Sequence, residues 1–143
     1  MAKFKQTTVA VDFDGVIADD TGVEFPQIGS PKPGAVEGLR QLHNLGCRIR
    51  IYTCRLNRHS LIEGTFQDQY EKIVAYLLEN GIPYDDIVVF DEGKPFADIY
   101  LDDRAVNFVN WEQAVQETIE ALDVKIASEV CRVIRIISSL GSI

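Results

Sequence analysis

The stretch TTVAVDFDGV, residues 7–16, decides the fold class of this chain. Residues 9–11 form a short apolar run with β-branched side chains, which is typical of a parallel strand buried on both faces. Asp12 and Asp14 follow at the point where this strand leaves the sheet. Ligands of open α/β sheets bind beyond the carboxyl ends of the strands, so two carboxylates there are either a turn device or part of a site.

The composition is that of an ordinary globular domain. The chain has 143 residues, which fits one domain with one hydrophobic core. Its 46% apolar and 25% charged residues exclude the disordered and membrane classes. The net charge of −8 argues against general nucleic-acid binding, because phosphate backbones are held by an excess of Lys and Arg. We expect residues 1–143 to form a single domain with a helical C-terminal segment from about residue 111.

Targeting signals and cysteine usage indicate a cytoplasmic protein. No apolar run approaches the roughly 20 residues of a membrane span, and the start MAKFKQTTVA lacks the apolar core of a secretory signal. Cys47, Cys54 and Cys131 show no metal-binding spacing. An odd number of cysteines in an untargeted chain indicates reduced thiols, which we interpret as small apolar filler.

Hydrophobic periodicity predicts alternating strands and helices. The predicted strands are residues 9–11, 48–53, 87–90 and 99–101, and the predicted helices are residues 35–45 and 66–80. The second helix is expected to bury Tyr70, Ile73, Val74, Leu77 and Leu78. This order predicts an α/β fold: a three-layer, Rossmann-like parallel sheet with right-handed crossovers and helices on both faces. Residues 15–34 read as a loop that is too short for a cap domain.

The C-terminal tail is expected to be mostly helical. A first helix is predicted near residues 111–122. Residues 124–140 have the apolar spacing of an amphipathic helix but contain many β-branched residues. This apolar face could pack on the domain or on a second subunit, so a homo-oligomer is one expectation. A membrane-surface helix is the alternative, which the modest number of basic residues does not favour.

Polar residues follow all four predicted strands. In chain order these residues are Asp12 and Asp14, Thr53, Lys94, and Asp102 and Asp103. Because the carboxyl ends of parallel strands meet at one edge of a sheet, these side chains can converge. Together they supply a nucleophile, an acid/base group, a hydroxyl and a cation for an anion, and acidic ligands for a hard metal.

This set of groups matches the requirements of phosphoryl transfer. A carboxylate can attack a dianionic phosphate only if Mg²⁺ and an ammonium group, here Lys94, neutralise the charge. Asp12 could then form an aspartyl phosphate, while Asp14 protonates the leaving oxygen and later activates water. Phe13 would point into the core so that both carboxylates face the same way, and Gly15 would let the backbone turn.

These motifs resemble those of the haloacid dehalogenase-like (HAD) phosphohydrolase superfamily. The matching segments are DFDGVIAD at residues 12–19, Thr53 at the end of RIRIYT, Lys94 in GKPFADIYLDD, and the acidic pair Asp102 and Asp103. The match spans residues 9–103, about two-thirds of the chain. It implies a Rossmann-like HAD fold with Mg²⁺ as the cofactor.

The resemblance also implies a role for each matching residue. Asp12 would be the nucleophile and Asp14 the acid/base, while Thr53 and Lys94 would hold the phosphoryl group. The implied metal ligands are Asp12, Asp14 through its backbone carbonyl, Asp102, and Asp103 either directly or through water. Which of the last two aspartates binds the metal directly stays open.

The substrate is not identified by the sequence. Only 38 residues separate Asp14 from Thr53, so no cap domain fits between them and the site should be open. Such a site suits a large substrate, or a small one covered by a neighbouring subunit. The basic loop after Thr53 offers Arg55, Asn57, Arg58 and His59 as substrate contacts, with a solvated loop as the alternative. Arg104 would instead neutralise the neighbouring carboxylates.

Three functions follow from these residues. The leading one is a Mg²⁺-dependent phosphatase that hydrolyses a phosphomonoester, of a small molecule or a macromolecule, through an aspartyl phosphate. Another phosphoryl transferase would need a cap to exclude water. A non-catalytic Mg²⁺ or phosphate-binding module, or a phospho-acceptor, would leave Asp14 without a role. Neither nucleic acid nor a membrane is an expected partner.

Overall fold

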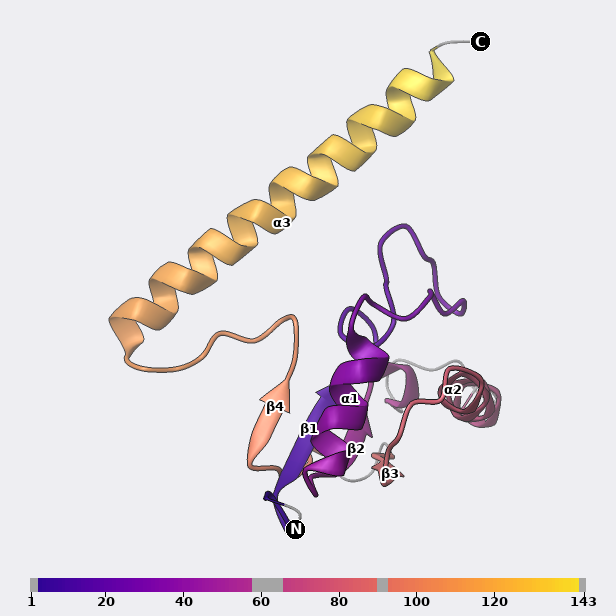
Figure 1. Cartoon of the computed structure of the whole chain (residues 1–143). Coiled ribbons are helices and arrows are strands. Elements are labelled where there is room, and N and C mark those ends of the chain that lie inside the picture. Colours follow the sequence, from indigo (N-terminus) through magenta and orange to yellow (C-terminus); the bar gives the residue numbers. More distant parts are fainter. Residues whose placement is uncertain (1–2, 58–65, 90–92, 142–143) are drawn as a thin grey trace. The chain divides into compact units, whose positions relative to one another are not determined.

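The computed structural model describes residues 3–57, 66–89 and 93–141. The chain divides into two compact units, Met1–Asp103 and Arg104–Ile143. Figure 1 shows the order of the elements along the chain. The first unit contains the sheet and all the predicted site motifs, whereas the second contains one long helix.

A four-stranded parallel sheet forms the centre of the first unit. Its strands are β1 (Thr8–Asp12), β2 (Arg48–Tyr52), β3 (Asp86–Ile87) and β4 (Ile99–Leu101), in the spatial order β3-β2-β1-β4. All three strand pairs are parallel. The predicted parallel α/β fold is therefore confirmed. The third strand is shorter than predicted, since Val88 and Val89 lie outside it, and Phe90 lies outside the described residues.

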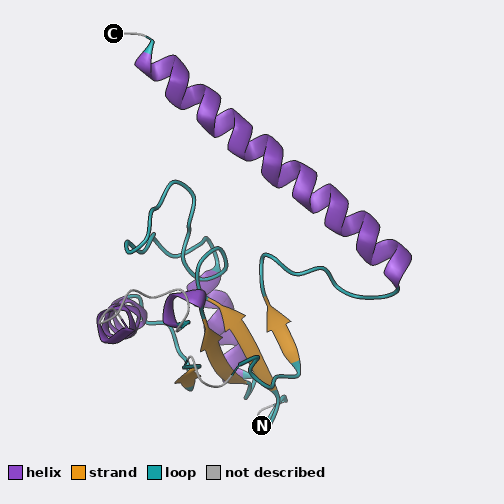
Figure 2. Cartoon of the chain, turned by 180° about the vertical axis from the view of Figure 1, so that it is seen from behind, coloured by secondary structure: helices purple, strands orange, loops and turns teal. Residues whose placement is uncertain are grey.

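Helices α1 (Ala35–Asn44) and α2 (Phe66–Glu79) pack on the same face of the sheet. The chain steps from β1 to β2 to β3 in one direction, and right-handed crossovers place both connecting helices on one side. Side chains from the strands and both helices form one buried cluster that includes Val11, Phe13, Leu39, Ile51, Ile73 and Leu77. Burying each large side chain contributes roughly 1.5–3 kcal/mol. The sequence predicts helices on both faces of the sheet. The two α-helices described in the first unit, α1 and α2, lie on one face. Figure 2 shows the sheet from the opposite side.

Burial in the structure agrees with some of the sequence-based predictions and differs from others. Phe13 is fully buried, which confirms that it points into the core. Leu78 was assigned to the wrong face of α2, because it is 80% exposed and Gln69 is buried instead. Cys47 is buried filler as predicted, but Cys54 and Cys131 are exposed, so the filler interpretation is wrong for them.

The connection from β1 to α1 is a folded loop. The amide of Gly15 donates to the carbonyl of Ala18 at 2.8 Å, and the amide of Lys32 donates to the carbonyl of Ile17 at 2.8 Å. These bonds hold the loop against the end of β1. No separate cap domain occurs among the residues described in the first unit.

The second unit contains α3 (Trp111–Leu140), a single helix of 30 residues. The side chain of Asn110 caps it by accepting a 2.9 Å hydrogen bond from the amide of Gln113. The sequence contains neither Gly nor Pro between residues 111 and 140, so nothing interrupts the helix despite its β-branched residues. None of the helices in the described ranges combines the length and apolar character needed to cross a membrane.

Candidate functional site

Three carboxylates meet where β1 and β4 end. Val11 pairs with Leu101 in the parallel register, so Asp12 at the end of β1 lies beside Asp102 and Asp103 after β4. Each of the three aspartates offers an oxygen that lies within 4.8 Å of the other two. The structure therefore brings the first and fourth predicted motifs together. We call Asp12, Asp102 and Asp103 the carboxylate cluster.

Gly15 allows Asp103 to approach the backbone after β1. Its φ of +84° lies in the left-handed region that favours glycine. A Cβ atom at this position would lie 2.3 Å from Oδ2 of Asp103, much closer than atoms can pack. Glycine is thus favoured here for two reasons, the positive φ of the turn and the space that the Asp103 carboxylate occupies.

Burial and the neighbouring negative charges disfavour the ionised form of Asp12. Burial, with a smaller contribution from the charges of Asp102 and Asp103, raises the pKa of Asp12 to about 7. The amide of Phe13 donates a 2.8 Å hydrogen bond to Oδ1 of Asp12, which partly opposes this rise and orients the carboxylate. The cluster is therefore an electrostatically unfavourable arrangement that a bound cation would relieve.

Tyr52 at the end of β2 supports the cluster from one side. Its hydroxyl donates a 2.5 Å hydrogen bond to Oδ2 of Asp102. Burial and the neighbouring carboxylates raise the pKa of Tyr52 above its ordinary value, so the hydroxyl remains a donor at neutral pH. This bond fixes the direction of the Asp102 carboxylate.

The donor set fits a hard divalent cation such as Mg²⁺. Mg²⁺ prefers oxygen ligands and is usually held by one or two carboxylates together with waters and substrate phosphate oxygens. The cluster offers three carboxylates, of which Asp103 is exposed and Asp12 and Asp102 are partly buried. Asp12 and Asp102 could hold the ion from the sheet, with Asp103 on the solvent side.

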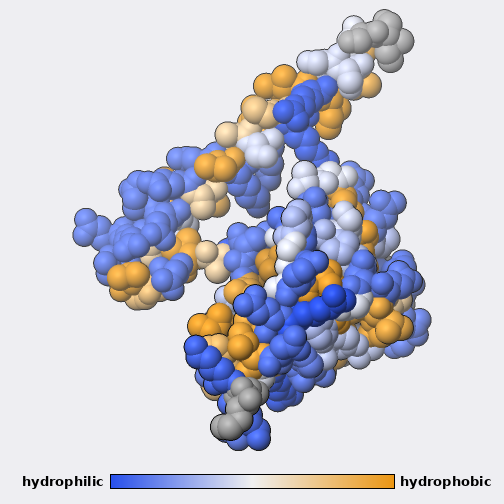
Figure 3. Space-filling model, in the orientation of Figure 1, coloured by the Kyte–Doolittle hydropathy of each residue, from blue (hydrophilic) through white to orange (hydrophobic). Residues whose placement is uncertain are grey.

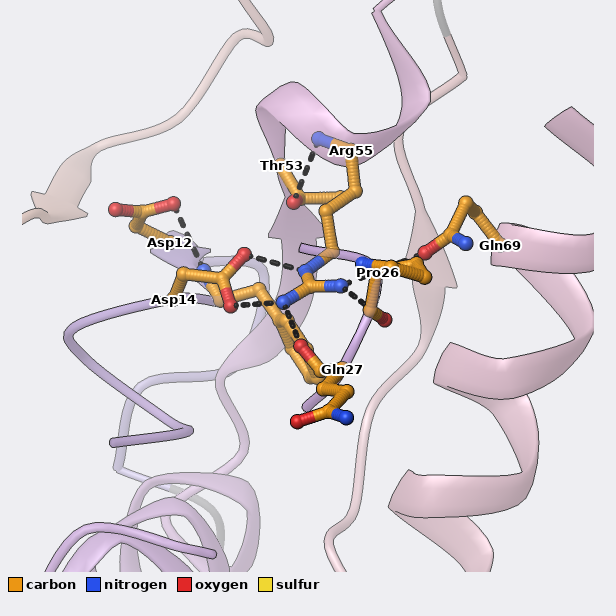
Figure 4. A network of polar contacts seen from close by, with 8 residues as sticks. Asp12, Asp14, Pro26, Gln27, Thr53, Arg55 and Gln69 are labelled. Atoms are coloured by element: carbon orange, nitrogen blue, oxygen red, sulfur yellow. Dashed lines mark hydrogen bonds and ion pairs between the residues drawn. The ribbon is translucent and has the colours of Figure 1, made fainter. Parts of the chain in front are cut away.

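Asp14 lies in a different environment from Asp12, although only Phe13 separates them. Nε of Arg55 donates to Oδ2 of Asp14 at 2.6 Å, and Nη2 donates to Oδ1 at 2.8 Å (Figure 4). This is a bidentate guanidinium–carboxylate pair, the strongest and most directional form of the interaction. Both oxygens of Asp14 are therefore held in a defined direction.

Arg55 is itself held by two further segments of the chain, the loop at residues 25–27 and α2. Nη1 donates to the carbonyl of Pro26 at 3.0 Å and to Oε1 of Gln69 at 3.4 Å, and Nη2 donates to the carbonyl of Gln27 at 2.6 Å (Figure 4). The guanidinium carbon lies 5.4 Å from the ring centre of Phe25. Arg55 is only 7% exposed, and this set of partners is what makes burial of its charge tolerable.

Thr53 and Lys94 have contacts of their own. Oγ1 of Thr53 accepts a 3.1 Å hydrogen bond from the amide of Arg55 and caps the short 3-10 helix η1 (Cys54–Leu56), which carries Arg55. Nζ of Lys94 lies 4.6 Å from the ring centre of Tyr100. Their predicted roles in holding a phosphoryl group stay predictions.

The predicted substrate contacts also stay predictions. The contacts of Arg55 described above are with the protein itself, and Asn57 ends η1 with its amide donating to the carbonyl of Cys54. Arg58 and His59 lie outside the described residues. Arg104 belongs to the second unit.

Several residues of the site were not found from the sequence. Gln69 gives a signal in retrospect, because it is a polar residue on the buried stripe of α2 that also contains Ile73 and Leu77. Tyr52 ends a strand next to Thr53 and could have been recognised by its position. The carbonyls of Pro26 and Gln27 give no local signal, since their role depends on the path of the whole loop.

Comparison with known proteins places these features in context. No family model matches the chain. A protein of Chlorobaculum tepidum that carries the provisional name 5'(3')-deoxyribonucleotidase is 41% identical over 76 residues, which are 52% of this chain and 36% of that protein. The chain therefore matches only about a third of the length of this curated relative.

Two solved structures are similar over most of the chain. A conserved protein from Bacteroides thetaiotaomicron aligns with a TM-score of 0.52 and 25% identity, covering 80% of this chain and 89% of that one. A structural-genomics target from Vibrio cholerae aligns with a TM-score of 0.52 and 28% identity, covering 81% of this chain and 99% of that one. Both resemble the chain in its α/β architecture.

Proposed function

We propose that this chain, a small parallel α/β protein with the motifs of the haloacid dehalogenase-like superfamily, is a Mg²⁺-dependent phosphatase. It hydrolyses a phosphomonoester through an aspartyl phosphate on Asp12. The observation that carries the proposal is the carboxylate cluster at the ends of β1 and β4, with a second, separately held aspartate two residues after Asp12.

In the first step, a carboxylate oxygen of Asp12 forms a bond to phosphorus as the bond from phosphorus to the ester oxygen breaks. The leaving oxygen takes a proton from Asp14 and departs as an alcohol. In the second step, water attacks phosphorus, gives a proton to Asp14, and the bond from phosphorus to Asp12 breaks. A bound Mg²⁺ would neutralise the charge that otherwise keeps two anions apart.

Arg55 would position Asp14 for both proton transfers. The guanidinium fixes the direction of both oxygens of Asp14, and the loop carbonyls of Pro26 and Gln27 fix the guanidinium. Asp14 has to carry a proton in one half of the cycle, so one arm of the bidentate pair rearranges during turnover. We therefore regard Arg55 as a positioning residue that acts through Asp14.

A deoxyribonucleoside monophosphate is the first substrate class to test. The support is the name of the Chlorobaculum tepidum relative, whose match includes only 36% of its own length. A small phosphorylated molecule also agrees with the net charge of −8, which disfavours long nucleic acids. The three free cysteines support a reducing, cytoplasmic setting as part of this proposal.

The Arg55–Asp14 pair favours a second candidate function, a phospho-acceptor whose aspartyl phosphate serves as a signal. If the pair holds the oxygens of Asp14 away from the attacking water, Asp14 does not activate it and the phosphoryl group on Asp12 persists. The lifetime of the phosphorylated protein separates the two functions. A phosphatase clears the group within a turnover, whereas an acceptor keeps it long enough to isolate.

The direct test is phosphate release from a panel of phosphorylated compounds, with and without Mg²⁺. We expect release by the native chain in Mg²⁺, and loss of release in Asp12→Asn and without the metal. Asp68→Asn is the matched control, because Asp68 is an exposed carboxylate on α2 that pairs with Lys72 at the surface. Release that persists in Asp12→Asn would refute the proposal.

A further inference from the structure

We propose that α3 is an association surface that binds α3 of a second copy of this chain in an antiparallel arrangement. The inference uses only residues 111–140 and is independent of the proposed function. It commits the apolar face of this helix to one occupant, a second copy.

A continuous apolar stripe runs the whole length of α3. Its members are Trp111, Val115, Ile119, Leu122, Ile126, Val130, Val133, Ile137 and Leu140. They are separated by steps of three or four residues that average about 3.6, which is the period of a straight α-helix. The stripe therefore stays on one side of the helix instead of winding around it.

Within the described part of the second unit, no other element covers this stripe. The nine side chains retain between 50% and 76% of their accessible surface, and α3 contains no buried residue. Figure 3 shows apolar side chains at the surface along this helix, between polar ones. Monomeric proteins rarely expose apolar patches larger than a few hundred Å², so a stripe of this length indicates a surface that packs against another apolar surface.

The dimensions of the stripe suit a reversible dimer. A helix of 30 residues is about 45 Å long, and a seam about 10 Å wide would cover roughly 450 Å² on each copy. Two such faces bury roughly 900 Å² in total, which is slightly below the size of stable specific interfaces and within the range of weak, reversible ones. We therefore expect a dimer that dissociates at low micromolar concentration.

The charges of α3 favour an antiparallel pair. Residues 111–123 contain four acidic side chains and no basic one, whereas residues 124–140 contain three basic side chains and one acidic one. An antiparallel pair places each acidic half beside a basic half, while a parallel pair places the two acidic halves together. Opposed helix dipoles favour the same direction. Exposed charge pairs are individually weak, so the stripe supplies the affinity and the charges select the direction.

Sedimentation equilibrium of the full chain from 1 to 100 μM tests the association. We expect a monomer–dimer equilibrium in the native chain and at least a tenfold weaker dimer in Ile126→Asp. Val124→Asp is the matched control, because Val124 is equally β-branched and 71% exposed but projects from the opposite side of the helix. We expect this control to dimerise like the native chain, and circular dichroism should show the same helix content in all three. A native chain that is monomeric at 100 μM would overturn the proposal, as would equal loss of dimer in both variants.

The direction of the pair is tested by Glu117→Lys combined with Glu120→Lys. These changes leave residues 111–123 with no net charge. An antiparallel dimer loses its charge complementarity and should weaken several-fold, whereas a parallel dimer is relieved of repulsion and should strengthen. A stronger dimer in this double variant would contradict the antiparallel arrangement.

Discussion

Asp12 and Asp14 leave the same strand two residues apart, yet their environments are opposite. Asp12 lies among carboxylates, and its pKa is raised to about 7 by burial and by its acidic neighbours. Asp14 lies in a bidentate pair with Arg55, which the loop and α2 hold in place. The comparison shows that Asp12 lies among groups of its own charge, where a cation could bind, whereas Asp14 has its counter-charge within the fold.

The largest effect should come from removing Asp12, the proposed nucleophile in the carboxylate cluster. Asp12→Asn is expected to lower kcat by at least about 10³-fold, because an amide cannot form the aspartyl phosphate. Steady-state phosphate release measures this loss, and Asp68→Asn should stay near the native rate. If Asp12→Asn kept a tenth of the native kcat, Asp12 would not be the nucleophile.

Breaking the Arg55–Asp14 pair should lower kcat by an amount that depends on the leaving group of the substrate. Arg55→Gln is expected to lower kcat about 10²-fold for alkyl phosphates, whose leaving oxygen needs the proton from Asp14. It should lower kcat much less for 4-nitrophenyl phosphate, whose leaving group needs none. Asp14→Asn should show the same selectivity for the first step.

Arg50→Gln is the matched control for this experiment. Arg50 is a largely buried arginine on β2 that pairs with Asp86 at 3.0 Å, a residue outside the site motifs. It should lower stability without changing the ratio of the two substrates. If Arg55→Gln lowered both rates equally, its role would be structural and the positioning role would be wrong.

Crowding the cluster should weaken metal binding without removing a carboxylate. Gly15→Ala places a methyl group in steric conflict with the Asp103 carboxylate, so we expect roughly tenfold weaker Mg²⁺ binding together with about 1–2 kcal/mol of left-handed backbone strain. Gly22→Ala is the control, since Gly22 has a φ of +71° but open space around it. Equal Mg²⁺ affinity in the two variants would show that the approach of Asp103 is unimportant for the metal.

The smallest effect should be on pH dependence. The folded-state pKa of Asp12 is raised from 3.8 to about 7, so the metal-free native state binds more protons than the unfolded chain in this window. Its free energy of unfolding should therefore fall as the pH rises from about 4 to 7, and Mg²⁺ affinity should fall as the pH drops below 7. Urea unfolding of native and Asp12→Asn chains at pH 5 and 8 measures the first effect. If both chains lost the same stability between these pH values, Asp12 would not be the group responsible.

The sequence predicted the sheet and the convergence of strand ends because these depend on local patterns. The apolar run before Asp12 and the acidic pair after residues 99–101 mark two strand ends, and parallel topology brings them together. Tertiary packing decided the rest. Leu78 lies about 100° around α2 from the buried Leu77 and is exposed. Gln69 lies two turns before Leu77 on the buried face, where it accepts a hydrogen bond from Arg55.

The pairing of Arg55 with Asp14 could not be predicted from the local sequence pattern either. Arg55 follows Thr53 in a polar stretch, which favours a solvent-facing substrate contact. Its burial depends on two carbonyls that the loop after β1 brings to it from more than 25 residues away. Such backbone acceptors have no signature in side-chain chemistry, so they could not be predicted without the fold.

Mg²⁺ binding to the full chain, measured by isothermal titration calorimetry at pH 8, tests the central claim most directly. We expect one ion per chain, at least tenfold weaker binding in Asp12→Asn and Asp102→Asn, and nearly native binding in Arg55→Gln. Such a result would place the cation at the carboxylate cluster and leave the Asp14 pair outside it. No binding by the native chain, or native affinity in Asp12→Asn, would contradict the account.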